Sequence, residues 1–241
     1  MTRYDPRKPL ISIHIPKCAG SSFAAVLKSW FGKGYLPHYH DEKENKPPQK
    51  YQLRTGFFRS RFRRGICIHG HFNHERGNGV KDYYPEVDQY ITFLRDPFDV
   101  HLSNYFYIKR DAKYLGGGAY REGVLRPLTK ESVTMENYLK WSQKSFFKSF
   151  FPPDINLTNY KEILEKEFIY IGITENFQNS VNILASRLGF PTVNVSRKNI
   201  SRWEEPVPDG ARDEFIENNP LEMAIYEYAL HNFGNASQVK E

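Results

Sequence analysis

The chain has 241 residues, and 39% of them are hydrophobic, which is enough to build the core of one large domain. Its formal net charge of +6 favours an anionic partner without choosing among nucleic acid, acidic glycan, a membrane surface and a polyanionic cofactor. The N-terminal segment MTRYDPRKPL lacks the apolar core of a signal peptide, and no apolar run is long enough to span a bilayer. These features predict a cytoplasmic protein, with one alternative: a Golgi-lumenal enzyme that has been separated from its membrane anchor.

The cysteine content of the chain is low. Cys18 and Cys67 are the only two cysteines, and they lack the spacing of metal ligands. A disulfide scaffold is therefore not expected. The chain is instead predicted to belong to a reducing compartment and to need no metal ion.

The first strong pattern in the chain is a strand, a turn and a helix. A mostly apolar run from Leu10 to Ile15 predicts a central strand. A turn that contains Lys17 then leads into a helix with one apolar face, which we expect to be capped by Ser21 or Ser22 and to end at the glycines after Phe31. Such a unit presents backbone N–H groups and a positive helix end to an anion. The turn is therefore a candidate seat for a phosphate or sulfate group.

Later segments repeat this alternation of strands and helices. Asp96 and Pro97 suit the N-cap and first position of a helix, and Gly189 suits the end of another. The polar segment 38–52 predicts a loop, and the glycine-rich segment 109–127 predicts a surface excursion. Further strands are expected at 66–72, 90–94 and 168–173, with helices from 97, at 135–147, after 174 and at 220–233.

This order of elements predicts an α/β fold in which helices flank a central, mostly parallel sheet. No Gly/Ser-rich or Pro-rich linker divides the chain, so we expect a single domain over residues 1–241. Its core is expected over about residues 10–200, and the helix at about 220–233 closes the chain.

The turn after the first strand differs from a Walker A loop. In that motif the lysine follows a glycine at the start of a helix, whereas Lys17 precedes Gly20 and lies next to the strand. An ordinary nucleotide triphosphatase is therefore a poor match. A structural turn with a solvated lysine remains an alternative for this segment alone.

A second motif lies at the end of the strand 90–94, where Arg95 is followed by Asp-Pro and, eight residues after the arginine, by Ser103. Together, HIPKCAGSSF and FLRDPFDVHLSNYFY resemble the motifs of sulfotransferases that use 3′-phosphoadenosine-5′-phosphosulfate (PAPS), most closely the carbohydrate group that includes heparan and uronyl 2-O-sulfotransferases. The resemblance implies that Arg95 and Ser103 hold the 3′-phosphate, for which the planar guanidinium is suited. It implies a 5′-phosphosulfate loop made of Lys17, Cys18, Ala19, Gly20, Ser21 and Ser22.

Two features qualify this second motif. Without the first motif, Arg95 would be expected to pair with nearby Asp96 or Asp99, and Ser103 to be a solvated helix residue. Many relatives carry arginine where this chain has His101, so a cofactor contact at that position is not carried over.

The stretch His69-Gly70-His71 supplies candidates for a catalytic base. A histidine with a pKa near 6.5 can take a proton from a hydroxyl near neutral pH, and strand alternation is expected to place both rings on one face. Uronyl 2-O-sulfotransferases have a similar stretch that includes their base, so the resemblance implies this role for one of the two. We favour His71 because it lies nearer the end of the strand, where ligands bind in open α/β sheets. The alternative is a buried, hydrogen-bonded pair; His74 and Glu75 are less favoured as bases.

Two basic segments are open to more than one interpretation. VNVSRKN extends the resemblance, and its Arg197 and Lys198 are candidates for contact with the 3′-phosphate or an acidic acceptor, although surface charge explains them equally well. A second group of arginines is interleaved with phenylalanines; it suits an anionic acceptor, a membrane headgroup or a solvated basic face, and matches no nucleic-acid-binding module. Its members are Arg54, Arg59, Arg61, Arg63 and Arg64.

These patterns predict a PAPS-dependent sulfotransferase, of a bacterial kind, that releases 3′-phosphoadenosine-5′-phosphate (PAP). Sulfuryl transfer by in-line displacement needs positioning and charge stabilisation, which Lys17 and backbone dipoles can supply without a metal. The expected acceptor is a hydroxyl of a carbohydrate, glycolipid or small metabolite. Aromatic side chains that could stack on a sugar ring are Tyr105, Tyr107, Tyr114 and Tyr120.

Two other functions remain as alternatives. An atypical P-loop kinase would depend on ATP and Mg²⁺. A non-catalytic binder of acidic glycan or nucleic acid would use the arginine group, and would show salt-sensitive binding with no affinity for PAP.

Overall fold

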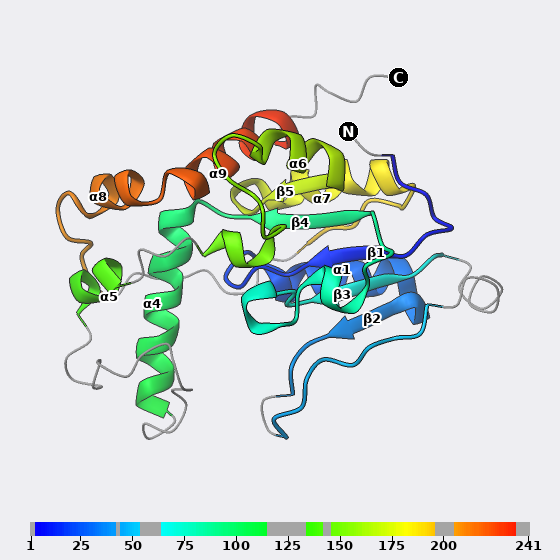
Figure 1. Cartoon of the computed structure of the whole chain (residues 1–241), viewed down its shortest axis with the longest axis horizontal. Coiled ribbons are helices and arrows are strands. Elements are labelled where there is room, and N and C mark those ends of the chain that lie inside the picture. Colours follow the sequence, from blue (N-terminus) through cyan, green and yellow to red (C-terminus); the bar gives the residue numbers. More distant parts are fainter. Residues whose placement is uncertain are drawn as a thin grey trace.

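The structure is a computed structural model that describes residues 3–41, 44–53, 64–114, 134–141, 146–195 and 205–234. The described residues build one α/β domain around a five-stranded, all-parallel sheet (Figure 1). This confirms the predicted fold class. The strands are β1 (Leu10–Ile13), β2 (Tyr35–His38), β3 (Cys67–Gly70), β4 (Tyr90–Leu94) and β5 (Phe168–Ile173), in the spatial order β2-β3-β1-β4-β5.

Some helices cover the sheet, and others lie beside one end of it. Figure 1 shows α4 standing away from the sheet with α5 and α8 on the same side of the molecule, and α9 lying near β5. In the part of the chain that the structure describes, no helix combines the length and apolar character needed to cross a bilayer. The helices are α1 (Gly20–Phe31), α3 (Val80–Tyr83), α4 (Pro97–Tyr114), α5 (Met135–Trp141), α6 (Tyr160–Glu167), α7 (Phe177–Leu188), α8 (Ala211–Asn218) and α9 (Pro220–Phe233).

The strand order creates a switch point at the centre of the sheet. From β1 the chain moves to one side to form the edge strand β2 and then β3, which lies between β2 and β1. It then crosses to the other side of β1 to form β4 and β5. Ligands of open α/β sheets bind at the carboxyl ends of the strands at such a point. The segments that follow β1, β3 and β4 are therefore placed together at the expected ligand-binding edge.

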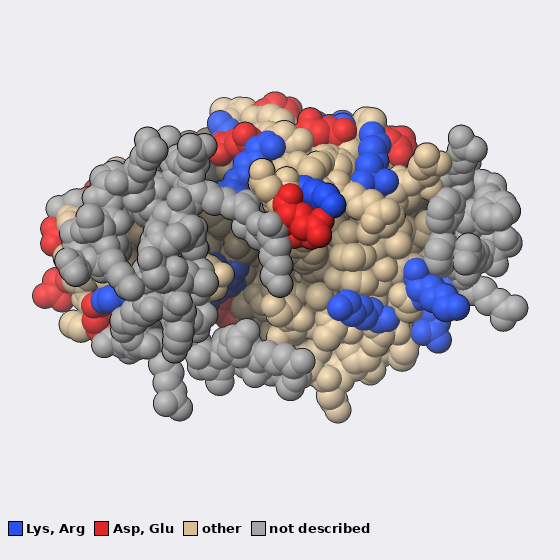
Figure 2. Space-filling view, turned by 90° about the horizontal axis from the view of Figure 1, so that it is seen from below, with Lys and Arg blue, Asp and Glu red and all other residues tan. Residues whose placement is uncertain are grey.

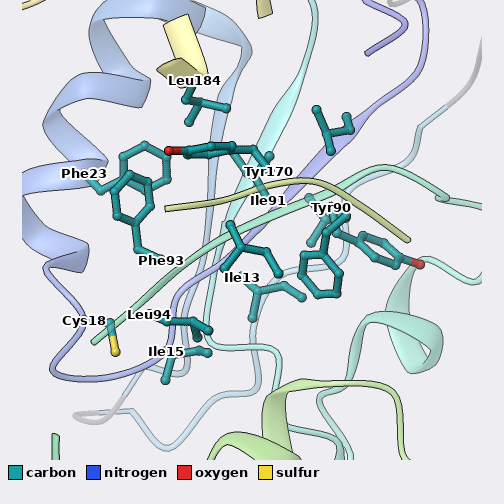
Figure 3. Close-up of a cluster of buried hydrophobic side chains, with 14 of the residues drawn as sticks. Ile13, Ile15, Cys18, Phe23, Tyr90, Ile91, Phe93, Leu94, Tyr170 and Leu184 are labelled. Atoms are coloured by element: carbon teal, nitrogen blue, oxygen red, sulfur yellow. The ribbon is translucent and has the colours of Figure 1, made fainter. Parts of the chain in front are cut away.

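Both the strands and the helices that face them are apolar because a parallel sheet is buried on both faces. Phe93 of β4 packs against Phe23 of α1 and Phe177 of α7, with ring centroids 4.4 and 5.2 Å apart. Figure 3 shows Phe23, Phe93, Tyr170 and Leu184 on one side of the sheet and Tyr90 with Ile13 on the other. This core fixes α1, whose first turn belongs to the candidate site.

A second apolar cluster holds α4 in place beside the sheet. It joins α4 to α5 and α8, and its rings include Tyr105 and Tyr138, with centroids 5.5 Å apart. Because one side of α4 is buried in this way, its other residues are presented in a fixed orientation. The buried members are Phe98, Leu102, Tyr105, Met135, Tyr138, Leu139, Phe215 and Met223.

Several predicted boundaries are confirmed. Asp96 caps α4 through a hydrogen bond of 3.1 Å from the Asp99 N–H to its side chain, and Pro97 is the first helical residue. Gly189 ends α7 in the left-handed conformation with φ of 72°. The last helix covers the expected range, and the two cysteines are free and buried.

The described part of the predicted loop 38–52 contains no helix or named strand after His38. Strand β2, which ends at His38, was not predicted, because it is short and contains Pro37; proline is tolerated there because β2 is an edge strand. Helices α6 and α8 were not expected, since α6 buries only Ile163 and Leu164 and α8 only Phe215.

The predicted surface excursion was wrong at its start, because α4 continues to Tyr114, and the rest of it, 115–127, lies outside the described residues. The helix expected at 135–147 ends at Trp141, and a short 3-10 turn follows at Phe147–Phe150.

Gly70 is the place where β3 comes closest to the edge strand. A Cβ atom added to Gly70 would lie 1.7 Å from the carbonyl oxygen of His38, far inside van der Waals contact. Glycine at position 70 therefore allows β2 to lie close to β3.

The substitution Gly70→Ala is expected to push β2 away and to lower the free energy of unfolding by roughly 1–3 kcal/mol, the usual cost of overpacking. Urea unfolding followed by circular dichroism measures this. Gly77→Ala is a matched control: Gly77 has φ of +68° and open space around its Cβ position, so alanine there should cost only the backbone term of about 1–2 kcal/mol. A Gly70→Ala protein that unfolds at the wild-type urea concentration would contradict the packing described here.

Candidate active site

The turn between β1 and α1, Pro16 to Gly20, is called here the Lys17 loop. Lys17 and Ala19 have positive φ angles of 67° and 58°, a region that residues other than glycine rarely occupy. Between them, Cys18 points inward and is 2% exposed, and its N–H donates to the Ile15 carbonyl at 3.2 Å. The alternation of left-handed residues with a buried one folds the backbone sharply between the strand and the helix.

The N-terminus of α1 is open to an anion. The helix begins at Gly20, with Ala19 at the N-cap and no side-chain cap, and its first turn contains no acidic residue. The prediction that Ser21 or Ser22 caps the helix was therefore wrong: both serines lie inside the first turn, because the left-handed Ala19 starts the helix before them. The first N–H groups of a helix have no intrahelical partner and carry partial positive charge. They suit an anionic group here.

Lys17 connects the loop to α4. Its Nζ lies 4.3 Å from the centroid of the Tyr107 ring, a cation–π contact. Tyr107 is 44% exposed, so this contact lies at the surface of the site. The positive charge of Lys17 is thus placed between the open end of α1 and an accessible aromatic ring.

Arg95 follows β4 and lies next to the Lys17 loop. Its backbone is in hydrogen-bonding contact with the Cys18 thiol, whose pKa is raised by burial, so that the thiol stays neutral and acts as a spacer between loop and strand. The Arg95 guanidinium lies 3.7 Å from the Asp99 carboxylate. Burial raises the pKa of Asp99, and the charge of Arg95 opposes that rise.

Ser103 lies on the same helix face as Asp99 and Tyr107, since the three are four residues apart. It is 5% exposed. Arg95 precedes α4, Asp99 lies in its first turn and Ser103 in its second, each four residues from the next. A phosphate placed there would meet the Arg95 fork and compete with Asp99 for it.

His101 lies on another side of α4 and points into the protein. It is 4% exposed, its Nε2 lies 3.6 Å from a carboxylate oxygen of the fully buried Glu222 of α9, and its ring packs on Phe215. The same carboxylate accepts a hydrogen bond of 2.6 Å from the Phe147 N–H. His101 thus joins α4 to α9 instead of facing the Lys17 loop.

His71 lies just beyond the end of β3, which stops at Gly70, so the expectation that His71 belongs to the strand was wrong. Its Nδ1 lies 2.8 Å from the His14 carbonyl oxygen. A carbonyl only accepts, so Nδ1 carries the proton, and the neutral ring has its lone pair on Nε2. This is the tautomer in which the outward nitrogen can act as a base. The ring is partly exposed.

His69 is in a different environment. It lies within β3, is 0% exposed, and its Nδ1 is 2.9 Å from the Ser12 hydroxyl of the neighbouring β1. Burial lowers its pKa to about 3. A fully buried ring cannot reach an acceptor hydroxyl, so the geometry separates the two histidines into an accessible one and a structural one.

Several predicted contacts fall outside the described residues: Arg197 and Lys198 for the cofactor, and Arg54, Arg59, Arg61 and Arg63 for an anionic surface. Arg64 is described, and its guanidinium donates to the Ser29 carbonyl at 3.3 Å near the end of α1. There it complements the negative end of the helix dipole. On the face shown in Figure 2, Lys and Arg side chains of the described residues are dispersed among uncharged and acidic groups and form no continuous basic patch.

Sequence patterns did not assign a role to two residues of this site. His14 stacks on the His71 ring, with centroids 4.3 Å apart, and its Nδ1 lies 2.9 Å from the Tyr39 hydroxyl. The position of His14 between a strand and the Lys17 loop is the signal that could have singled it out. Tyr39 follows the unexpected strand β2, so its position was hidden. Among the described residues, no group of three or more His, Cys, Asp or Glu is arranged to hold a metal ion.

Comparison with known proteins gives a family match and matches among solved structures. A family model described as the sulfotransferase family matches residues 1–223. Among solved structures, the chain is similar to mouse sulfotransferase SULT7A1 complexed with PAP, with 15% identity and a TM-score of 0.44 over 90% of this chain. The match covers 65% of that longer chain, just under two thirds of its length. None of the curated proteins matches this chain. Because the family model covers nearly the whole chain, the protein belongs to the sulfotransferase family.

Proposed function

We propose that this protein transfers a sulfuryl group from PAPS to an acceptor hydroxyl and releases PAP. The observation that carries the proposal is the meeting, at one edge of the sheet, of an open helix N-terminus, the charge of Lys17, and a histidine whose outward nitrogen holds a lone pair. Membership of the sulfotransferase family supports this choice of donor, as does the resemblance of the Lys17 and Arg95 motifs to those of PAPS-dependent enzymes.

The donor site is proposed to lie along the Lys17 loop and α4. The N–H groups of Gly20 to Ser22, with the Ser21 and Ser22 hydroxyls, would hold the 5′-phosphosulfate, because they present unsatisfied donors and helix-dipole charge. Cys18 and Ala19 would give the loop its shape. Arg95 and Ser103 would hold the 3′-phosphate, with Arg95 exchanging its partner Asp99 for the phosphate. Arg197 and Lys198 are proposed to add charge to the same site.

The chemistry supplied by PAPS is an activated sulfuryl group whose bond to the bridging phosphate oxygen breaks as the bond from the acceptor oxygen to sulfur forms. His71 would take the acceptor proton on Nε2, since its Nδ1 proton is held by the His14 carbonyl. Lys17 would stabilise the negative charge that develops on the bridging oxygen. Its contact with Tyr107 keeps the ammonium at the loop until then.

The acceptor is proposed to be a carbohydrate or glycolipid hydroxyl, with a small metabolite as the next choice. Of the four tyrosines considered, Tyr105 is buried in the cluster beside α5, whereas the exposed ring of Tyr107 lies beside Lys17. An accessible aromatic ring next to the reacting centre suits stacking on a sugar ring. The side chains of Tyr114 and Tyr120 lie outside the described part of the chain.

The direct test is transfer of radiolabelled sulfate from PAPS to a panel of sugar and glycolipid acceptors. Wild-type protein is expected to label an acceptor, and Lys17→Ala to lose roughly 10²–10³-fold in rate, as for removal of an oxyanion-stabilising group. Lys28→Ala is the matched control, because Lys28 lies in the last turn of the same α1; it should keep the wild-type rate. Near-normal transfer by Lys17→Ala would contradict the site assignment.

The two histidines are expected to differ when each is replaced. His71→Ala should keep PAP affinity, because the donor site is untouched, while transfer falls by roughly 10²–10⁴-fold, the usual contribution of a general base. His69→Ala should instead lower the melting temperature, because it opens a cavity in the core. Calorimetry, thermal unfolding and the transfer assay measure these effects. If His69→Ala stays folded, binds PAP and loses transfer while His71→Ala does not, the base is His69.

A further inference from the structure

His14 directly follows β1 and precedes the Lys17 loop. Its backbone N–H donates to the Gly70 carbonyl at 2.8 Å, and its own carbonyl accepts from Nδ1 of His71 at 2.8 Å. One residue thus anchors both the end of β3 and the proposed base to the strand that leads into the loop. A shift of the His14 backbone would move the loop and the His71 ring together.

The His14 side chain fills the space between the loop and His71. Its ring stacks on the His71 ring at a centroid distance of 4.3 Å and on the His69 ring at 5.3 Å. On the loop side, a Cβ atom added to Gly20 would lie 1.7 Å from His14 Nε2. The ring therefore lies directly against the Gly20 backbone, and a side chain at position 20 would have to displace it.

Tyr39 holds the His14 ring from the side of β2. The Tyr39 hydroxyl lies 2.9 Å from His14 Nδ1, and the Tyr39 ring meets the His71 ring edge-on with centroids 5.0 Å apart. Burial raises the pKa of Tyr39, so its hydroxyl stays protonated at neutral pH. The hydrogen bond from Tyr39 and the stacking on His71 both restrain the His14 ring.

The titratable groups in this stack other than His71 are uncharged at neutral pH. Burial, together with the nearby His71 and His69, lowers the pKa of His14 to about 2. Burial also lowers the pKa of His69 to about 3. Tyr39 is likewise neutral. A neutral His14 ring can lie against His71 without repelling the positive charge that His71 gains with a proton. It orients the base without competing for that proton.

We propose that His14 is a positioning residue that keeps Nε2 of His71 aimed at the acceptor hydroxyl, at a fixed separation from the Lys17 loop. The proposal rests on the sulfuryl transfer proposed above, since that reaction gives His71 a proton to accept. His14 touches neither substrate in this account. The His14 ring acts by stacking on the His71 ring. The hydrogen bond from His71 to the His14 carbonyl would not by itself stop the His71 ring from rotating.

The test compares wild type with His14→Asn, which keeps a polar atom near the Tyr39 hydroxyl and removes the stacked ring. Long-range ¹H–¹⁵N spectra of the imidazoles report which nitrogen of His71 carries the proton. Wild type is expected to show Nδ1–H alone, and His14→Asn a mixture of tautomers. The maximal transfer rate should fall roughly 10–100-fold, as for a misplaced catalytic group, while PAP affinity measured by calorimetry stays unchanged.

A second variant tests the same role if His14→Asn does not fold. Tyr39→Phe keeps every ring and removes only the hydroxyl that orients His14, so it should shift the His71 tautomers and the rate in the same direction by a smaller amount. Tyr51→Phe removes a hydroxyl that donates to the Pro37 carbonyl at 2.7 Å on β2. It is the matched control and should behave as wild type.

The outcomes separate this proposal from the proposed function. Unchanged His71 tautomers in both His14→Asn and Tyr39→Phe would overturn the positioning role, whatever the activity. A fall in PAP affinity that parallels the fall in rate would also overturn it, because His14 would then support the loop and not the base. If wild type transfers no sulfuryl group, the proposed function fails, and the tautomer comparison alone decides whether His14 orients His71.

Discussion

The candidate site depends on the register of β1 with its two neighbours. Ile13 is paired with Gly70 of β3 and with Thr92 of β4, so the three strands end at the same edge of the sheet. The segments that follow them are the Lys17 loop, His71 and Arg95, which come from distant parts of the chain. A slip of one residue would turn the side chains of β1 to the opposite face, and the apolar contacts on both faces of the sheet exclude that alternative. The packing of the hydrophobic core therefore sets the distances between the polar groups of the Lys17 loop, His71 and Arg95.

The site achieves its charge distribution with few charged groups. The open end of α1 and Lys17 supply positive potential, and the charge of Arg95 lies near that of Asp99. The buried residues between these charges are neutral: burial raises the pKa of the Cys18 thiol and lowers that of His69 to about 3. Because these packing groups are neutral, the local electric field comes mainly from the Lys17 loop and the N-terminus of α1. Fixed dipoles of this kind stabilise charge that develops during a reaction.

Sequence patterns predicted the parts of the structure that follow local rules. Asp96 with Pro97 marked the start of α4, Gly189 marked the end of α7, and apolar strands gave the parallel sheet, because capping and periodicity are properties of neighbouring residues. They failed where tertiary contacts decide. Nothing in the residues around Ala19 shows that it adopts a left-handed conformation and starts α1 before the serines. Similarly, β2 is visible only from its pairing with β3. Strand position favoured His71 over His69 in His-Gly-His, but only the tertiary structure shows that β3 ends at Gly70, with His69 fully buried in the sheet and His71 beyond its end.

The central claim is that the Lys17 loop and the Arg95 face of α4 form a site for a nucleotide with phosphates at its 5′ and 3′ positions. The most direct measurement is a calorimetric titration of the wild-type protein with PAP, and with ATP and Mg²⁺ in parallel. The account predicts one PAP bound per chain, at least roughly tenfold more tightly than ATP, because only PAP offers the 3′-phosphate to Arg95 and Ser103. Binding of ATP that equals or exceeds binding of PAP, or no heat with PAP at all, would contradict it.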